Sequence, residues 1–430
     1  MKNTFVVSCP LDTYSGYGAR SRDFVKALIE LDEYDVQILS QRWGKCSEGF
    51  IENNEEWGFL SKYIIPQLMQ KPDYWCQITV PNEFSPVGKY NIGLTAGMET
   101  TIVDGSWVEG CNKMDLILTS SEHSKNVFET SQFNKEGTDK IIKLEKPIEV
   151  LIEGLNLDTF KPIKEFKNKD LFNQINSIPE EFAYLTVGHW MQGEIGEDRK
   201  NIGLTIKSFY ELFKNRKNPP ALILKCCIVN GSILDKSEIL RRINIIKDGV
   251  PEARSLPKIY LLHGNFTDPE INELYNHPKV KAMISLTKGE GFGRPLLEFS
   301  AINKPIITTK WSGHMDFLKE EKVGYINGTL EKIHPTAVVQ NMIIPEASWY
   351  KPNLGDVGYL FNNVFEDYKN WLEKSKSQGF HSRKNFSFEV MKNQIENIFK
   401  KNLTPLPKKL ELKIPNIKMP NKPKSNLKKV

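Results

Sequence analysis

Short apolar segments alternate with longer amphipathic segments along almost the whole chain. A continuous apolar run favours a strand that is buried on both faces, as in a parallel sheet. In the first half such runs predict strands at residues 5–8, 36–39, 77–80, 91–95, 116–119 and 149–152. Helices are predicted at 19–31, where Phe24, Ala27 and Leu28 share one face, and at 122–129, after a capping serine pair.

The second half repeats this alternation. Apolar runs predict strands at residues 183–187, 221–227, 259–262, 281–286 and 305–308. Helices are predicted between them at residues 201–213, 235–246, 269–275 and 294–302. Strands that alternate with helices indicate an α/β fold with parallel sheets covered on both faces. The pattern therefore predicts two Rossmann-like units of similar size.

Breaks in this pattern suggest domain boundaries. Between residues 158 and 179 Lys, Asn and Pro dilute the apolar positions, so we place a first domain at 1–165 and a second at 166–375. Residues 356–401 read as helical with a break at Gly379. We expect the segment 376–402 to pack back across the first domain. Residues 403–430, rich in Pro and Lys, are predicted to be disordered.

Charge is distributed unevenly along the 430 residues. The formal net charge is +5, but residues 403–430 hold eight lysines and one acid, which leaves −2 for the rest. A basic surface for nucleic acid or anionic lipid is therefore not implied for the body of the protein. The tail is either a solubilising end or a weak docking segment for a polyanion, such as modified DNA or an anionic membrane.

The cysteine pattern and the hydropathy indicate an intracellular protein. None of the six cysteines forms a C-x-x-C pair, and Cys226 and Cys227 lie in a predicted buried strand, so we expect reduced thiols. The first residues are too weakly apolar for a signal peptide, and no window of about 18 apolar residues occurs. We expect a soluble, cytoplasmic protein.

The segment Lys288-Gly-Glu-Gly-Phe-Gly-Arg-Pro-Leu-Leu-Glu298 is the sharpest candidate for chemistry. It follows an apolar strand and opens a helix, with Pro295 near the helix start. Glycines at such a turn expose backbone N–H groups, and a helix N-terminus favours an anion such as a diphosphate. Glu290 and Glu298 could accept hydrogen bonds from sugar hydroxyls. Acids near a helix start also stabilise the helix itself, by roughly 0.3–1 kcal/mol.

These residues resemble the Glu-x7-Glu motif of the retaining GT-B glycosyltransferases, glycosyl transferases of group 1. The resemblance covers about residues 4–399 and implies two Rossmann-like domains facing a central cleft. It implies that Glu290 lies near the donor sugar and that Glu298 binds the nucleotide ribose. The glycine turn between them, Gly291-Phe292-Gly293, would then contribute to the donor site. It also implies transfer with retention at the anomeric carbon.

A second segment is similar to the family's diphosphate clamp. In that family a strand ends in Gly, usually followed by an Arg, and a Lys follows at a helix start. Lys200 matches the lysine, but His189 stands at the position of the usual arginine. Arg199 could supply the second cation, because its guanidinium binds phosphate oxygens in a bidentate manner. Charges on a solvated helix start are the alternative.

A glycine loop near the N-terminus resembles the loop that faces the donor phosphates in this family. Gly16 and Gly18 lie between the first predicted strand and helix. A tight turn would explain both glycines equally well. Arg20 and Arg22, just inside that helix, either reach the cleft or lie on its outer face.

Two further residues are candidates by position. Glu99 lies past the end of a predicted strand, where open α/β sheets bind ligands. Related transferases often carry His or an acid in this loop, which implies that Glu99 orients the acceptor or accepts its proton. A carboxylate that anchors the loop is the alternative. His314 could approach the cleft, although a capping Ser312 explains its loop without a ligand.

Absent motifs exclude several enzyme classes. The sequence contains no Asp-x-Asp, H-x-x-x-H, H-E-x-x-H, G-x-S-x-G or G-x-x-x-x-G-K-[ST]. We therefore expect no metal site and no cofactor, with a nucleotide-diphosphate sugar as the donor. Its base, its sugar and the acceptor stay open; a glycan, a lipid-linked sugar or modified nucleic acid would qualify as acceptor. An epimerase, a phosphorylase-like enzyme or a non-catalytic sugar-nucleotide binding module are the alternatives.

Overall fold

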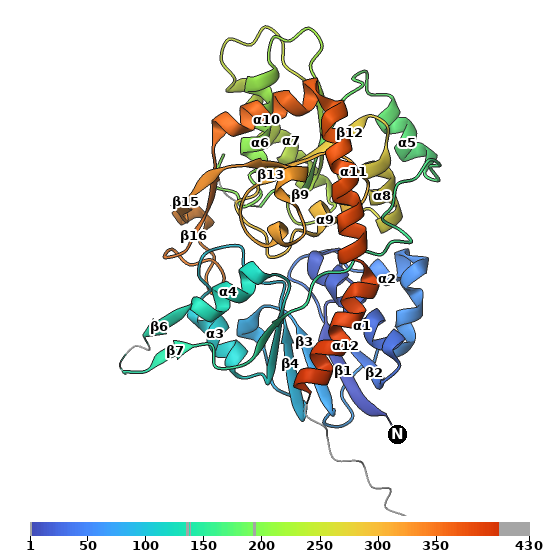
Figure 1. Cartoon of the computed structure of the whole chain (residues 1–430), viewed down its shortest axis with the longest axis vertical. Coiled ribbons are helices and arrows are strands. Elements are labelled where there is room, and N and C mark those ends of the chain that lie inside the picture. The colour runs from blue at the N-terminus through green and yellow to red at the C-terminus, as the bar shows by residue number, and fades with distance from the viewer. Residues whose placement is uncertain (1, 135–136, 138, 192–194, 404–430) are drawn as a thin grey trace, which may run out of the picture.

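The computed structural model describes residues 2–134, 137, 139–191 and 195–403, which form two α/β halves (Figure 1). The first half is built on a six-stranded parallel sheet in the order β2-β1-β3-β4-β5-β8. Its strands are β1 (Asn3–Cys9), β2 (Tyr34–Ser40), β3 (Tyr74–Ile78), β4 (Tyr90–Leu94), β5 (Leu116–Thr119) and β8 (Ile148–Val150). The predicted tail lies outside the described residues, apart from Leu403.

The second half is built on another six-stranded parallel sheet, in the order β11-β10-β9-β12-β13-β14. Its strands are β9 (Ala183–His189), β10 (Ala221–Cys227), β11 (Ile259–Leu262), β12 (Val280–Ser285), β13 (Ile306–Thr309) and β14 (Gly324–Ile326). The predicted α/β class with two Rossmann-like parallel sheets is confirmed.

Alternation along the central strands explains the apolar runs in the sequence. In β1, Phe5 and Val7 pack into one core while Val6 packs into the core on the opposite face. In β9, Leu185 and Tyr184 divide in the same way between two cores. Because helices cover both faces of each sheet, both sets of side chains are buried and the strands are apolar throughout.

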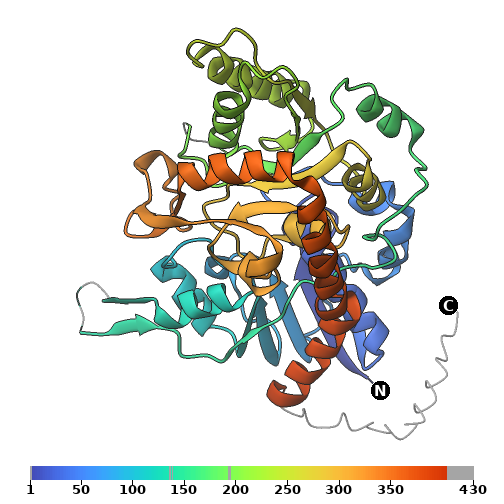
Figure 2. The same cartoon turned by 45° about the horizontal axis from the view of Figure 1, so that its top comes forward.

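Helices cover both sheets (Figure 2). In the first half they are α1 (Gly16–Leu31), α2 (Phe50–Asn53), α3 (Gly105–Asn112) and α4 (Glu122–Thr130). In the second half they are α5 (Lys169–Asn176), α6 (Ile202–Phe213), α7 (Ile233–Asp248), α8 (Asp268–Asn276), α9 (Arg294–Ser300), α10 (Leu354–Glu366) and α11 (Tyr368–Asn385). The last described helix, α12 (Phe388–Asn402), lies beside α1 of the first half (Figures 1 and 2).

The C-terminal helix joins the first core through large apolar side chains. Met391, Ile395 and Phe399 are buried there, and the ring of Phe399 stacks on Phe5 of β1 with centroids 5.7 Å apart. Before this helix, the turn between α11 and α12 is tied to Leu155, whose N–H donates to the Phe386 carbonyl and whose carbonyl accepts from the Phe388 N–H. The chain therefore crosses between the halves twice.

Two details of the prediction are wrong. The third strand is Tyr74–Ile78 rather than 77–80, because Tyr74 and Trp75 are also buried. Gly379 is not a helix break, since it lies inside α11. A Cβ at Gly379 would overlap the side chain of Asn303, so glycine allows close packing there. The structure adds two hairpins that the apolar pattern does not predict, β6–β7 (Gln132–Asn134, Ile141–Lys143) and β15–β16 (Gly328–Lys332, Ser348–Pro352).

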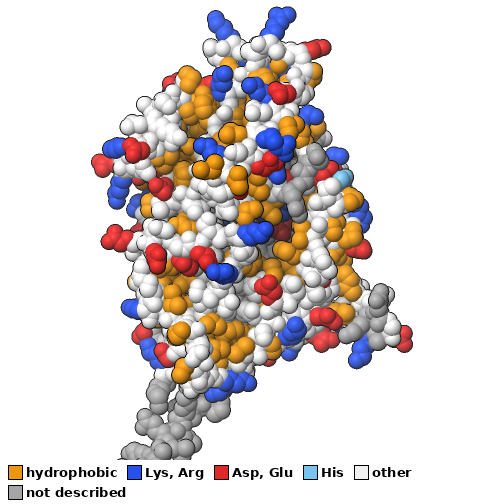
Figure 3. Space-filling model, turned by 180° about the vertical axis from the view of Figure 1, so that it is seen from behind, with side chains coloured by type: hydrophobic (Ala, Val, Ile, Leu, Met, Phe, Trp, Pro, Cys, Tyr) orange, Lys and Arg blue, Asp and Glu red, His pale blue; other side chains and the backbone are white. Residues whose placement is uncertain are grey.

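The mixed surface charge and the free cysteines agree with the expectations from the amino-acid composition. Over the face shown in Figure 3, basic and acidic side chains are interspersed with apolar ones. All six cysteines are free thiols, four of them buried. Among the described residues, none of the helices combines the length and the apolarity that a membrane crossing requires.

Candidate functional site

Four charged side chains from three loops meet where the two sheets face each other. Lys200 precedes α6, Glu290 follows β12, and Glu99 follows β4 of the first half. Lys200 Nζ lies 2.6 and 2.8 Å from the two Glu290 carboxylate oxygens. Arg199 Nη1 lies 3.4 Å from Glu290 Oε2 and 3.4 Å from Glu99 Oε1, and donates to the Gly289 carbonyl at 3.0 Å. We call these four charged residues, 99, 199, 200 and 290, the cation cluster.

Burial makes the interactions in this cluster strong. The Glu290 side chain is 7% exposed and the Lys200 side chain 15%. Burial alone would raise the pKa of Glu290, but Lys200 and Arg199 outweigh it and lower that pKa to about 2. The carboxylate is therefore charged at neutral pH. Its partner Lys200 has a pKa lowered chiefly by burial, an effect that Glu290 opposes.

Glycines allow the loops of the two halves to touch at this point. A Cβ at Gly289 would overlap the Glu99 carbonyl, and one at Gly291 would overlap the Ala96 carbonyl. Ser121, the cap of α4, donates from Oγ to the Gly291 carbonyl at 2.6 Å. Close packing between the two halves therefore requires glycine at 289 and 291, whether or not a ligand binds there.

A cavity of about 240 Å³ lies between the two halves. We call it the central cavity. None of the four residues of the cation cluster lines it, but its lining residue His189 lies close enough to Lys200 for the two to interact electrostatically. Of the residues that the sequence predicts to bind the donor, Gly16 and Glu298 line it. Nothing lies within 4 Å of a Cβ built on Gly16, so the cavity reaches the start of α1. The first half also contributes Tyr14, Ser15, Ala19, Arg22, Ser47 and Phe50; the second half contributes His189, Lys225, Cys227, Val229, Gly264, Asn265, Phe266, Asp268, Ile271, Arg294 and Pro295.

Glu298 lines the cavity from the first turns of α9. Its Oε1 accepts a hydrogen bond from Arg294 Nε at 2.8 Å, and Tyr275 donates to Oε2 at 3.4 Å. Burial raises the pKa of Glu298 to about 8, against the lowering effect of Arg294 and with further raising by Asp268 and Glu153. The local excess of carboxylates therefore weakens the acidity of this group.

His189 lines the central cavity and lies near Lys200 of the cation cluster. It follows Gly188, whose position faces the aliphatic part of Lys200, and its Nδ1 lies 3.4 Å from Cys227 Sγ. Burial lowers the pKa of His189, and the nearby cations of Lys200 and Lys225 add to this. The imidazole is therefore neutral at pH 7, and Arg199 is the second cation beside Lys200.

Other predicted residues have structural contacts. A Cβ at Gly18 would overlap the Thr13 carbonyl, and its N–H already donates to Ser15 Oγ at 2.9 Å. Phe292 packs against Phe317 in the second core, with ring centroids 5.0 Å apart. Gly293 has φ +100°, a left-handed conformation that favours glycine.

The two arginines of α1 differ in role. Arg20 is fully buried and its Nη1 donates to the Ile152 carbonyl at 2.5 Å, so it lies neither in the cleft nor on the outer face. Arg22 lines the cavity and donates to the Leu11 and Thr13 carbonyls. His314 is completely buried against the Thr309 carbonyl, 2.7 Å from its Nε2.

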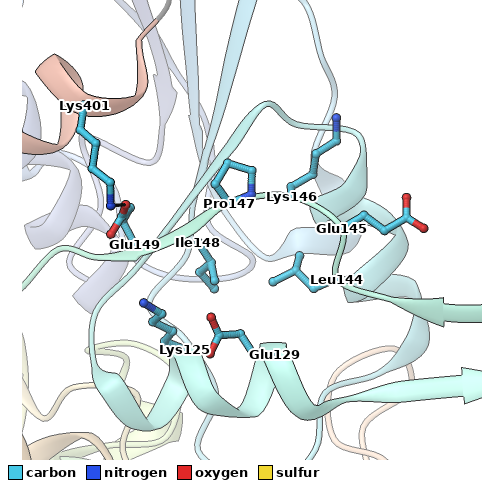
Figure 4. Close-up of a pocket in the computed structure, with 9 residues that line it drawn as sticks. All are labelled: Lys125, Glu129, Leu144, Glu145, Lys146, Pro147, Ile148, Glu149 and Lys401. Atoms are coloured by element: carbon cyan, nitrogen blue, oxygen red, sulfur yellow. Dashed lines mark hydrogen bonds and ion pairs between the residues drawn. The ribbon is translucent and has the colours of Figure 1, made fainter.

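A larger hollow, of about 490 Å³, is lined by side chains of α4, of residues 144–149 and of α12 (Figure 4). Lysines 125, 146 and 401 and glutamates 129, 145 and 149 surround it, and Lys401 Nζ lies 2.6 Å from Glu149 Oε1. Because its charges balance, the hollow offers no particular attraction for an anion. It also lies apart from the residues of the cation cluster.

Sequence reasoning missed Arg294 and its partner Asp23, whose Oδ2 lies 2.5 Å from Arg294 Nη1. Arg294 lies inside the motif segment, and its spacing of four residues from Glu298 could have suggested a helical ion pair. Nothing in the sequence marks Asp23 as its partner, because the contact joins two distant helices. The residues after β10 and β11 that line the central cavity belong to no sequence motif, so the sequence does not single them out.

Comparison with known proteins agrees with this architecture. Residues 252–339 match the family model of "Glycosyl transferases group 1". No curated protein sequence matches the chain.

Several solved structures share the fold across nearly the whole chain. Sucrose-phosphate synthase from Thermosynechococcus elongatus has a TM-score of 0.60 at 11% identity, covering 93% of this chain and 99% of its own. An α,α-trehalose-phosphate synthase from Burkholderia xenovorans, described as UDP-forming, has a TM-score of 0.57 at 10% identity, covering 94% and 100%. Anabaena HepE in complex with UDP-glucose has a TM-score of 0.53 at 13% identity, covering 93% and 100%.

Proposed function

We propose that the chain is a glycosyltransferase of group 1, since residues 252–339 match that family model and the whole chain shares the GT-B fold. We further propose that it transfers a sugar from a nucleoside diphosphate with retention at the anomeric carbon and without a metal ion. The observation that carries the proposal is the cation cluster. Lys200 and Arg199 converge with Glu290 and Glu99, and Glu298 lines the central cavity.

In this proposal the donor lies across both features. The nucleoside occupies the central cavity with its ribose against Glu298, and the diphosphate points toward Lys200 and Arg199. The sugar then lies near Glu290 and the turn 291–293. The backbone at Gly16 borders the cavity from the first half. UDP-sugars are the first donors to test, because the structurally similar HepE has been solved in complex with UDP-glucose.

Catalysis is proposed to rest on positioning and on charge. Negative charge develops on the leaving diphosphate as the glycosidic bond breaks, and preorganised cations stabilise it most where water is excluded. Lys200 is bound by Glu290 in this structure, so the diphosphate must replace or share that partner. Glu99 reaches the cluster from the first half through its contact with Arg199. In this proposal it orients the acceptor or accepts its proton.

The organisation of the chain follows the same proposal. Residues 1–165 form the acceptor-side domain, 166–375 the nucleotide-sugar domain, and 376–402 the returning helical segment. The basic tail, 403–430, docks weakly on a polyanion near the acceptor. We place the protein in the cytoplasm. Parts of the site come from both halves, so closure of the halves gates the reaction.

Release of nucleoside diphosphate from UDP-glucose, GDP-mannose and ADP-glucose, without and with candidate acceptors, tests the function. Ligands that bind only the folded state raise its melting temperature, so a parallel thermal-shift panel reports binding. The proposal predicts binding, slow donor hydrolysis that resists EDTA, and an α-linked product from an α-linked donor. Binding without any turnover across the panel would instead favour the binding module.

A further inference from the structure

Arg294 occupies an unusual place in the wall of the central cavity. It is the first residue of α9, and its guanidinium contacts carboxylates from three segments. Nε lies 2.8 Å from Glu298 Oε1 on the same helix, and Nη1 lies 2.5 Å from Asp23 Oδ2 on α1 of the first half. Glu153, which follows β8, lies 3.7 Å from Nη1. One side chain therefore joins the two halves at the edge of the cavity.

Arg294 contacts two carboxylates through two different nitrogens of its guanidinium group. Nε faces Glu298 while Nη1 faces Asp23, so the two carboxylates are held on different nitrogens. The side chain of Arg294 is 14% exposed and that of Asp23 is 3% exposed. A planar, delocalised cation suits such a double contact, whereas the point charge of lysine does not.

The charge balance gives Arg294 a second effect. Burial raises the pKa of Glu298 to about 8, and Arg294 is the strongest influence in the opposite direction. Asp268 and Glu153 act with burial. Arg294 thus favours the carboxylate form of Glu298, which accepts hydrogen bonds with both oxygens, whereas the protonated form loses acceptor capacity.

We infer that Arg294 is a positioning residue that holds the Glu298 carboxylate toward the ribose hydroxyls of the bound nucleotide, with Asp23 of the other half as its anchor. The inference rests on the proposed function, because it needs a nucleotide in the central cavity. It goes further by assigning ribose recognition to a contact between the halves. If only the second half held the nucleotide, the site would discriminate less between ribose and deoxyribose.

The expected consequence is discrimination between ribose and deoxyribose. A hydrogen bond between a sugar hydroxyl and a charged group contributes enough for a preference of about tenfold or more. With Arg294→Lys the charge remains but the double contact is lost, and the preference falls to less than about threefold. Asp23→Asn, which keeps the side-chain shape but removes the anchoring charge, lowers the preference in the same direction.

Calorimetric titration of the full chain with UDP, GDP, ADP and CDP, each beside its 2′-deoxy and 3′-deoxy form, measures this preference. The matched control is Arg241→Lys, an exposed arginine of α7 paired with Glu238 on its own helix. We expect the control to keep the preference of the unmodified chain. Melting temperatures establish that each variant is folded.

The outcomes separate the two proposals. If none of the four nucleotides binds the unmodified chain, the proposed function fails. If one binds but prefers neither sugar, or if folded Arg294→Lys and Asp23→Asn both keep the full preference, the role of Arg294 is overturned. Should Arg294→Lys not fold, Asp23→Asn decides alone, and an unchanged preference there rejects the inference.

Discussion

Glu290 and Glu298 belong to one loop-to-helix segment and are both almost fully buried, yet their surroundings shift their pKa values in opposite directions. Around Glu290 two cations, Lys200 and Arg199, face it directly, and its pKa falls to about 2. Around Glu298 a single arginine is shared with other carboxylates, and its pKa rises to about 8.

Because both acids are buried to a similar extent, the local ratio of cations to carboxylates accounts for the difference between their pKa values. Both groups lose hydration to a similar extent, so burial alone would raise both pKa values. Only Glu290 has enough opposite charge to overcome this effect. A buried ion pair whose cation can exchange its carboxylate for a ligand suits the diphosphate. The oxygens of Glu298, which are held by a single shared arginine, suit neutral hydroxyls.

Removing the cation beside Glu290 should have the largest effect. Lys200→Met deletes a preorganised charge at the leaving diphosphate, so we expect transfer to fall by about 100- to 1000-fold. The variant should also lose up to about 3–5 kcal/mol of stability at pH 7, because the buried Glu290 carboxylate keeps only its longer contact with Arg199. Initial rates with the preferred donor and urea unfolding measure the two effects.

A double variant separates the two losses. Lys200→Met combined with Glu290→Gln removes the buried charge that has lost its main partner, so stability should recover while activity stays low. The matched control, Lys376→Met, breaks an exposed pair with Glu373 on α11 and should change neither quantity appreciably. Full activity in a folded Lys200→Met chain would contradict the role of this lysine.

The pH dependence of stability should reveal the low pKa of Glu290. Its folded pKa of about 2 lies below the ordinary value of 4.5, so the ionised group stabilises the fold above pH 4.5. That stability, of about 3 kcal/mol, is lost as the pH falls from 4.5 toward 2. The difference in unfolding free energy between the unmodified chain and Glu290→Gln should therefore narrow over this range. A constant difference would exclude the depressed pKa.

Glu298 should show the opposite dependence in another pH window. Its folded pKa of about 8 lies above 4.5, so the protonated group is fully compatible with the fold below pH 4.5. Stability is then lost as the pH rises from 4.5 through 8. Relative to the unmodified chain, Glu298→Gln should gain stability over that range. If the stability of the two proteins instead changed in parallel with pH, the raised pKa of Glu298 would be contradicted.

Removing the tail should have the smallest effect and should leave both glutamates unaffected. A chain that ends at Leu403 keeps the residue that packs against the first core but lacks all eight tail lysines. Donor hydrolysis should be unchanged, while binding to duplex DNA or anionic vesicles at low salt should weaken. Equal binding by the truncated and full chains would remove the proposed docking role.

The strands of both sheets could be predicted from the sequence, because each strand is an apolar run of neighbouring residues. These runs predict the strands of both sheets within a few residues, apart from the shifted third strand and the short β14. Gly379 misleads the helix prediction because its reason is tertiary: α11 packs closely on the turn at Asn303. Propensity cannot reveal such a contact.

For the candidate site, local motifs predict residues but not their partners. Lys200, Arg199, Glu290 and Glu99 are candidates from separate segments, and the fold brings them together. The family resemblance implies ligand contacts for the segments of Phe292 and Gly18, although packing accounts for both residues. Arg294 and Asp23 escape sequence reasoning because an ion pair between distant helices depends on how the halves meet.

Calorimetric titration of UDP and UDP-glucose into the unmodified chain and into Lys200→Met tests the central claim most directly. The account predicts saturable binding to the unmodified chain, at least about tenfold weaker binding to a folded Lys200→Met chain, and unchanged binding to Lys376→Met. Equal affinity for all three chains would contradict a donor held by its diphosphate at Lys200.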